Sequence, residues 1–133
     1  MFTYTRTAQY HETDQMGVIH HANYLKWMEE ARIAFLDSVG LSYRGVEQGG
    51  IVSPVTAITV EYKRPVQFGD TVEIEVSVAG YTGVRCELQY TMRLLNTGEV
   101  CTTGVSKHCF LKNGRVIALQ KAAPKIDAVL RTE

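Results

Sequence analysis

The sequence predicts an α+β domain in which one long central helix packs against a curved antiparallel sheet of about five strands. Two patterns support this prediction. Apolar side chains recur at steps of three and four residues over one long stretch, 23–39, as they do on one face of a helix. From residue 51 onward, apolar and polar side chains alternate in several runs, as they do in half-buried strands. The 133 residues suit one domain, 1–133, with a single hydrophobic core.

The first strand is predicted over 2–10, which is rich in aromatic and β-branched residues. The polar stretch HETDQMGVIHHA follows, contains three of the four histidines, and predicts a loop. The long helix then begins near Asn23, a favourable N-cap, and stops at Gly40. A further short helical turn is expected within 42–50.

The remaining chain is almost all strand. Pro54 interrupts the first of these strands, which favours an edge position or a bulge at its start. NTGE and Asn113-Gly114 are turn signals, and the second is typical of a tight hairpin. Pro124 precedes an apolar pattern that predicts a short terminal helix. The predicted strands span 51–62, 70–82, 84–94, 100–111 and 115–119.

The lengths of these elements favour one architecture. A helix of about 17 residues extends about 25 Å, whereas a strand of about 11 residues extends about 37 Å. A twisted sheet of such strands can curl around the helix, which is the hotdog fold. Because one helix leaves sheet edges uncovered, edge pairing between subunits is expected, and we predict a homodimer or homotetramer.

Composition excludes several classes of partner. Fourteen basic and fourteen acidic residues cancel, so no general attraction for nucleic acid or for an anionic membrane is expected. Cys86, Cys101 and Cys109 are an odd number without a CxxC pair, which suits reduced core thiols. The sequence has no apolar run long enough to enter a membrane and no signal core. A cytoplasmic protein is therefore expected.

The loop before the helix concentrates ionisable groups. A helix start offers unpaired N–H groups and the positive end of the helix dipole, which stabilise an anion or a developing oxyanion. A carboxyl group, an imidazole and such a site within one segment suit hydrolysis of an activated acyl group. The adjacent His20 and His21 cannot present two imidazoles on one helical face, so no metal site is expected.

The same residues carry a family resemblance. The run Y-x-x-x-D-x-x-G-V-x-x-H-x-x-Y starts at Tyr10, and L-x-W-x-E-x-A-R follows it. Together with Tyr62-Lys63-Arg64-Pro65 and Gly69-Asp70, this pattern resembles the hotdog-fold acyl-CoA thioesterases of the YbgC and 4-hydroxybenzoyl-CoA thioesterase group. The resemblance implies hydrolysis of an acyl-CoA thioester to a carboxylic acid and coenzyme A, without a cofactor.

The resemblance also implies roles for individual residues. Asp14 matches the essential carboxylate and would act as general base or as nucleophile, two routes that the sequence leaves open. Tyr10 and His21 match the tyrosine and histidine that accompany it. The backbone amides expected to polarise the thioester carbonyl are those of Gly17, Asn23 and Tyr24. On spacing alone, Asp14 is equally well explained as a turn residue. The alternative for His21 is a polar cap before the helix.

Residues that contact the acyl group and residues that contact coenzyme A are both expected near Asp14. The side chains of Met16, Val18 and Ile19 are candidates for an acyl pocket. The phosphates of coenzyme A need local positive charge, for which Lys63 and Arg64 are candidates, although a solvated loop explains them equally well. An acyl carrier protein is an alternative donor because it presents the same phosphopantetheine arm. The alternative function is a non-catalytic acyl-thioester binding or scaffold protein of the same fold.

Overall fold

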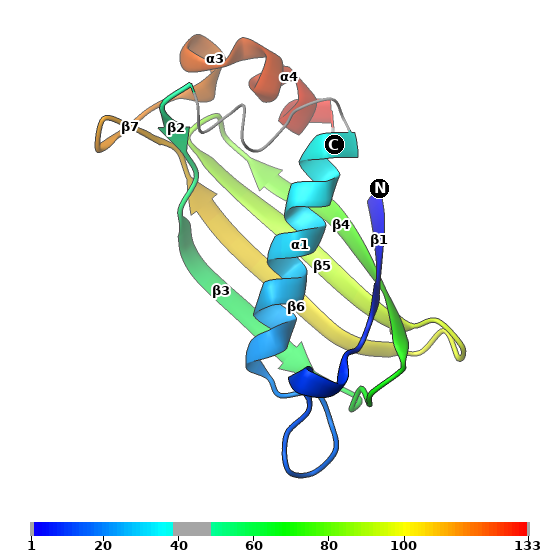
Figure 1. The fold of residues 1–133 in the computed structure, drawn as a ribbon. Helices are drawn as coiled ribbons and strands as arrows, with labels where there is room; N and C mark the ends of the chain where they lie inside the picture. Colours follow the sequence, from blue (N-terminus) through cyan, green and yellow to red (C-terminus); the bar gives the residue numbers. More distant parts are fainter. Residues whose placement is uncertain (1, 39–48, 133) are drawn as a thin grey trace.

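The computed structural model describes residues 2–38 and 49–132, and it has the predicted α+β hotdog architecture (Figure 1). The long helix α1 lies across a five-stranded antiparallel sheet of order β1-β4-β5-β6-β3. A small second sheet has the order β2-β7-β8. The elements are β1 (Phe2–Thr7), η1 (Tyr10–Glu12), α1 (Ala22–Ser38), β2 (Ile51–Val52), β3 (Val55–Tyr62), β4 (Thr71–Tyr81), β5 (Arg85–Leu94), β6 (Val100–Cys109), β7 (Leu111–Lys112), β8 (Arg115–Val116), α3 (Leu119–Ala122) and α4 (Pro124–Thr132).

The core lies between α1 and the sheet. The apolar stripe of α1 is buried, with Trp27, Met28 and Ala31 fully inaccessible to solvent. Alternate residues of β4 and β5 face this stripe, as the two-residue period of a strand requires. Each large apolar side chain buried in this way stabilises the fold by roughly 1.5–3 kcal/mol. The buried stripe therefore determines which face of α1 packs against the sheet.

The N-terminal elements differ from their predicted bounds. Strand β1 ends at Thr7 rather than at residue 10, because its pairing partner β4 begins at Thr71, directly opposite. Residues Tyr10–Glu12 then form a single 3₁₀ turn. Helix α1 starts at Ala22, whose amide donates to His20 Nδ1 at 3.2 Å. The predicted N-cap, Asn23, thus lies inside the helix, and residues 39–48, with the predicted helix stop and most of the predicted short turn, fall outside the described residues.

Most of the strand pattern in the second half of the chain is confirmed. Pro54 divides the predicted strand over 51–62 into β2 and β3. Strand β3 lies at one edge of the main sheet and begins with a register shift. The hairpin turn has positive φ at Asn113 and Gly114, as predicted. The predicted strand over 115–119 is short, because the chain enters α3 at Leu119, which is fully buried. Helix α4 confirms the terminal helix.

The two ends of α1 have different surroundings. Helices α3 and α4 lie beside its C-terminal end, whereas the loop that joins β1 to α1 projects beyond its N-terminal end (Figure 1). That loop contains Asp14 and the histidines singled out in the sequence. Within residues 2–38 and 49–132, no helix is long and apolar enough to cross a membrane.

Candidate active site

The loop between η1 and α1 is a small hairpin, which we call the Asp14 hairpin and define as residues 12–20. Thr13 bridges Ile19, and the Asp14 amide donates to the Val18 carbonyl at 2.8 Å. The His20 amide closes the base by donating to the Glu12 carbonyl at 2.8 Å. The tip turns through Gly17, whose φ of 77° is a conformation that glycine adopts without strain.

The hairpin is attached to the connection between β3 and β4. The amide of Ile19 donates to the carbonyl of Val66 at 2.8 Å, and both side chains are buried. Val18 forms an isolated bridge with Gln67. These contacts bring a segment near the start of the chain against one that follows it by 47 residues (Ile19 to Val66) and 49 residues (Val18 to Gln67).

An open groove of about 330 Å³ lies where the two segments meet. It contains most of the site residues expected from the sequence and lies at the N-terminal end of α1. The lining residues are Asp14, Met16, Val18, Ile19, His21, Tyr24, Tyr62, Lys63, Arg64 and Pro65. The structure thus brings Lys63 and Arg64 together with the Asp14 hairpin.

Asp14 is half-buried in the groove wall. Its Oδ1 accepts hydrogen bonds from the amides of Met16 at 2.8 Å and Val18 at 3.4 Å. Among the described residues, no donor binds its Oδ2. The turn contact expected for an aspartate at this position is therefore present, and it leaves one carboxylate oxygen available to a ligand in the groove.

Three aromatic side chains form the adjacent wall. The Tyr62 hydroxyl donates to the His21 carbonyl at 3.2 Å, and its ring packs edge-on against Tyr24 with centroids 5.1 Å apart. The His21 ring is exposed and stacks on His20 at 4.2 Å. Burial raises the pKa of Tyr24 to about 12, so its phenol stays protonated near neutral pH. The sequence did not identify Tyr62 as a site residue, although it belongs to the motif Tyr62-Lys63-Arg64-Pro65. Its position directly before Lys63 could have indicated that it lies at the site.

Three predicted site residues do not line the groove. Tyr10 is 74% exposed and packs edge-on against Phe68, with ring centroids 5.6 Å apart. The amides of Gly17 and Asn23 already donate to the carbonyls of Asp14 at 3.1 Å and His20 at 3.0 Å. The Asn23 side chain turns back to donate to the Glu12 carbonyl at 3.0 Å.

The amides at the very start of α1 differ in how firmly they are held. The Tyr24 amide donates to the His21 carbonyl over 3.3 Å, which is longer than a typical N–H···O bond. The His21 amide has no hydrogen-bond partner among the described residues. The backbone donors least committed to the protein are thus those of His21 and Tyr24, both of which line the groove.

Charge at the groove rim is mixed. The amides of Lys63 and Arg64 both donate to the Cys101 carbonyl, at 2.8 and 3.0 Å, which anchors the backbone there. Their exposed side chains lie near carboxylates, with 3.7 Å from Lys63 Nζ to Glu61 and 3.1 Å from Arg64 Nε to Glu99. Surface pairs of this kind contribute little energy, so both cations remain free to turn toward an anion.

The three cysteines do not line this groove. Cys86, Cys101 and Cys109 are buried free thiols, as predicted. Burial raises the pKa of Cys86 to about 11, which keeps that thiol neutral and unreactive. Within the described ranges, no three His, Cys, Asp or Glu side chains are grouped so that they could hold a metal ion.

Comparison with known proteins points to one family. A model of the thioesterase-like superfamily matches residues 8–131. YneP of Bacillus subtilis, provisionally named an acyl-CoA thioesterase, is 37% identical over 119 residues, 87% of this chain and 85% of that protein. The acyl-CoA thioester hydrolase YbgC of Escherichia coli is 29% identical over 96 residues, 72% and 70% of the two chains. The crystal structure of a DHNA-CoA thioesterase from Staphylococcus aureus superposes with a TM-score of 0.93 at 32% identity, covering 98% of this chain and 88% of that one.

Proposed function

The chain belongs to the thioesterase-like superfamily, and from this premise we propose that it is a thioester hydrolase that cleaves an acyl-CoA into a carboxylic acid and free coenzyme A. The family match confirms the resemblance drawn from the residues. The observation on which the proposal depends is the Asp14 carboxylate in the groove wall, whose Oδ2 accepts no hydrogen bond from the residues that the structure describes. The relatives named above as acting on coenzyme A thioesters support the same reaction.

Asp14 is assigned the central chemical role. As general base, its free oxygen takes a proton from a water molecule while the water oxygen adds to the thioester carbonyl; the C–S bond then breaks and the thiolate leaves. As nucleophile, the same oxygen attacks the carbonyl, expels the thiolate and forms a mixed anhydride, which water hydrolyses. The hydrogen bonds from Met16 and Val18 hold the carboxylate for either route.

The developing oxyanion is assigned to the start of α1. The sequence pointed to the amides of Gly17, Asn23 and Tyr24, but the first two already donate to nearby carbonyls at ordinary distances. We therefore assign the oxyanion to the amides of His21 and Tyr24, at the positive end of the helix dipole. The His21 imidazole, exposed at the same wall, is assigned to orient the water or to donate to the carbonyl. Tyr10 does not line the groove of its own chain, so we assign it no role in the reaction.

The groove walls suggest how the two halves of the substrate are held. Met16, Val18 and Ile19 offer apolar surface for the acyl group on the Asp14 side. Lys63 and Arg64, on the opposite rim, are assigned to the phosphates of coenzyme A or to the phosphate of the same arm on an acyl carrier protein.

A second copy of this chain is the proposed partner. Seven of the eight residues of β3 are exposed, and no other strand of the described part of the chain pairs with its outer edge, which ends at the groove. Pairing of two such edges would extend the sheet and cover the apolar side chains of Val55 and Ile58. We propose a homodimer formed in this way, alone or as half of a homotetramer.

The test is Asp14→Asn in a thiol-release assay over a panel of acyl-CoA substrates. Asparagine keeps the oxygen that accepts the Met16 amide but removes the charge, so we expect kcat to fall by about 100-fold or more while the fold persists. Asp70→Asn is the matched control, because the Asp70 carboxylate also accepts a backbone amide, that of Gln67 at 2.9 Å, and does not line the groove. Tight acyl-CoA binding without thiol release by the wild type would contradict the proposal and favour a scaffold.

A further inference from the structure

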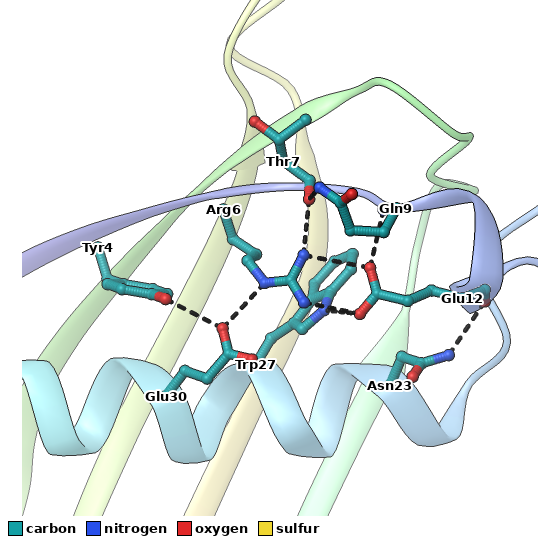
Figure 2. Close-up of polar contacts among 8 residues, drawn as sticks. All are labelled: Tyr4, Arg6, Thr7, Gln9, Glu12, Asn23, Trp27 and Glu30. Atoms are coloured by element: carbon teal, nitrogen blue, oxygen red, sulfur yellow. Dashed lines mark hydrogen bonds and ion pairs between the residues drawn. The ribbon is translucent and has the colours of Figure 1, made fainter.

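A buried polar cluster joins β1, the Asp14 hairpin and α1, and its centre is Glu12 (Figure 2). Only 3% of Glu12 is exposed, although it carries a carboxylate two residues from Asp14. One carboxylate oxygen accepts the Trp27 indole N–H at 2.9 Å and Arg6 Nη2 at 2.8 Å. The other accepts the Gln9 amide at 2.8 Å and Arg6 Nη1 at 3.2 Å.

These four contacts determine the charge of Glu12. Burial by itself raises the pKa of this carboxyl, but hydrogen bonds from Trp27 and the Gln9 amide, together with the positive charge of Arg6, outweigh burial and lower the pKa. Glu12 is therefore ionised near neutral pH. Because both oxygens are fully engaged with protein donors, this carboxylate has no oxygen to offer a substrate.

The backbone of Glu12 is held as firmly as its side chain. Its carbonyl accepts the His20 amide at 2.8 Å, which is the base of the Asp14 hairpin, and the Asn23 side-chain amide at 3.0 Å, which comes from the first turn of α1 (Figure 2). One residue thus fixes the hairpin to β1 through Arg6 and to α1 through Trp27 and Asn23.

We propose that Glu12 is a positioning residue that holds the Asp14 carboxylate at the working distance from the first amides of α1. Asp14 lies in the hairpin, Tyr24 lies in the first turn of α1 and His21 directly precedes that helix, and the Glu12 contacts link the hairpin to α1 directly. An error of about 1 Å in such an alignment costs about 100-fold in rate. This inference rests on the proposed function, because it assigns Glu12 a role in the same reaction.

The chain contains a matched control in Glu30, on the other side of the same arginine. Glu30 accepts Arg6 Nε at 2.9 Å and the Tyr4 hydroxyl at 3.0 Å (Figure 2). Glu30 and Glu12 therefore both form an ion pair with Arg6. Among the described residues, Glu30 makes no hydrogen bond to the Asp14 hairpin. Loss of its charge should disturb the cluster without releasing the hairpin.

The experiment compares Glu12→Gln with Glu30→Gln in the full chain. Glutamine keeps the shape of Glu12, but in either orientation its N–H₂ group faces an Arg6 donor together with the Trp27 or the Gln9 N–H, so the anchor is broken. We expect kcat of Glu12→Gln to fall by about 10-fold or more, with KM within about threefold. For Glu30→Gln we expect kcat within about twofold of the wild type. Equal loss in both variants, or an unchanged kcat in folded Glu12→Gln, would overturn the proposal.

Amide hydrogen exchange supplies a readout that does not depend on activity. In Glu12→Gln the amides of Asp14, Val18 and His20, which donate within the hairpin, should exchange faster than in the wild type. In Glu30→Gln they should keep wild-type rates. If the wild type hydrolyses no acyl-CoA, the proposed function fails, whereas the exchange result still decides whether Glu12 holds the hairpin. Unchanged exchange in Glu12→Gln would overturn the inference in either case.

A second variant decides the matter if Glu12→Gln does not fold. Asn23→Ala removes the side-chain hydrogen bond to the Glu12 carbonyl and keeps the ion pair of Glu12 with Arg6 and every backbone amide. We expect a smaller fall in kcat, about threefold or more, together with faster exchange of the His20 amide. Wild-type kcat and wild-type exchange in Asn23→Ala would then overturn the proposal.

Discussion

Two carboxylates two positions apart have opposite environments, and this contrast separates their roles. Glu12 is buried, and all of its acceptor capacity is used by Arg6, Trp27 and Gln9. Asp14 is half-exposed and keeps one oxygen free of the described residues. The family resemblance singled out Asp14, but the sequence could not identify Glu12, whose partners Arg6 and Trp27 come from other elements.

Another residue shaped by its surroundings is His108, on the inner face of β6. Its Nε2 lies 2.7 Å from the Ser106 hydroxyl, which lies 2.8 Å from the Tyr90 hydroxyl. Burial, reinforced by the nearby charge of Arg32, lowers the pKa of His108 to about 4, below its usual 6.5. The imidazole is therefore neutral within the core at neutral pH.

We expect His108 to make the protein less stable as the pH falls from 6.5 toward 4. In this range His108 is protonated in the unfolded chain but not in the folded chain, so proton binding favours the unfolded state. The shift of the pKa to about 4 corresponds to a loss of about 2 kcal/mol between pH 7 and 4.5. Urea unfolding at these two values measures the change in the free energy of unfolding.

The control for this titration is His108→Gln, which stays neutral throughout. Its free energy of unfolding should depend less on pH in the same interval, whatever its stability at pH 7. The carboxyls whose pKa is lowered, Glu12 and Asp127, lose their stabilising effect mainly below their ordinary values and act equally in both proteins. An identical pH dependence in the two proteins would contradict the assignment.

At the scale of elements, a tight contact between α1 and the sheet occurs where Met28 meets Gly104 of β6. A Cβ atom built on Gly104 would lie 2.9 Å from Met28 Cε and 3.2 Å from its Sδ. Met28 is fully buried, so its terminal methyl has little space into which to move. The absent side chain at Gly104 therefore leaves the space that the end of the Met28 side chain fills against β6.

Gly104→Ala is expected to destabilise the fold by about 1–2 kcal/mol, because the added methyl overpacks the interface between α1 and β6. The free energy of unfolding in urea measures this effect. In a Met28→Ala background the same change should cost less, since the opposing side chain has been removed, and the two substitutions should not be additive. A neutral or stabilising Gly104→Ala would show that the helix can shift without cost.

For the whole molecule, the most conspicuous feature is the uncovered edge formed by β3. Its sequence is rich in β-branched residues, yet nearly all of the strand is exposed in a single chain. A strand edge of this length with apolar side chains usually pairs with another strand or is protected by charge. The proposed dimer is the arrangement that removes this exposure.

Sedimentation of the wild type should therefore give the mass of two or four chains. Ile58→Lys places a charge on the exposed edge of β3 and should shift the protein toward single chains, because a lysine there opposes edge pairing. Thr5→Lys, an exposed position on β1 at the opposite edge of the sheet, is the control and should leave the mass unchanged. A wild type that sediments as one chain would contradict the proposed dimer.

Much of this protein could be predicted from sequence alone because the relevant forces act locally. The apolar stripe of α1, the alternation in β4 and β5, the break at Pro54 and the turn at Asn113-Gly114 each depend on neighbouring residues. The Asp14 segment was recognised for the same reason, since its chemistry is contiguous in the chain.

Only the tertiary structure determined which residues meet. The groove combines the Asp14 hairpin with Tyr62 and Lys63, and the Glu12 anchor combines Arg6 with Trp27. These pairings depend on the strand order β1-β4-β5-β6-β3 and on the seating of α1, which result from burial summed over the whole core. A pattern over a few residues does not report burial summed over the whole core. The sequence therefore identified chemical groups such as Asp14, whereas the tertiary structure determined which of these groups lie close to one another.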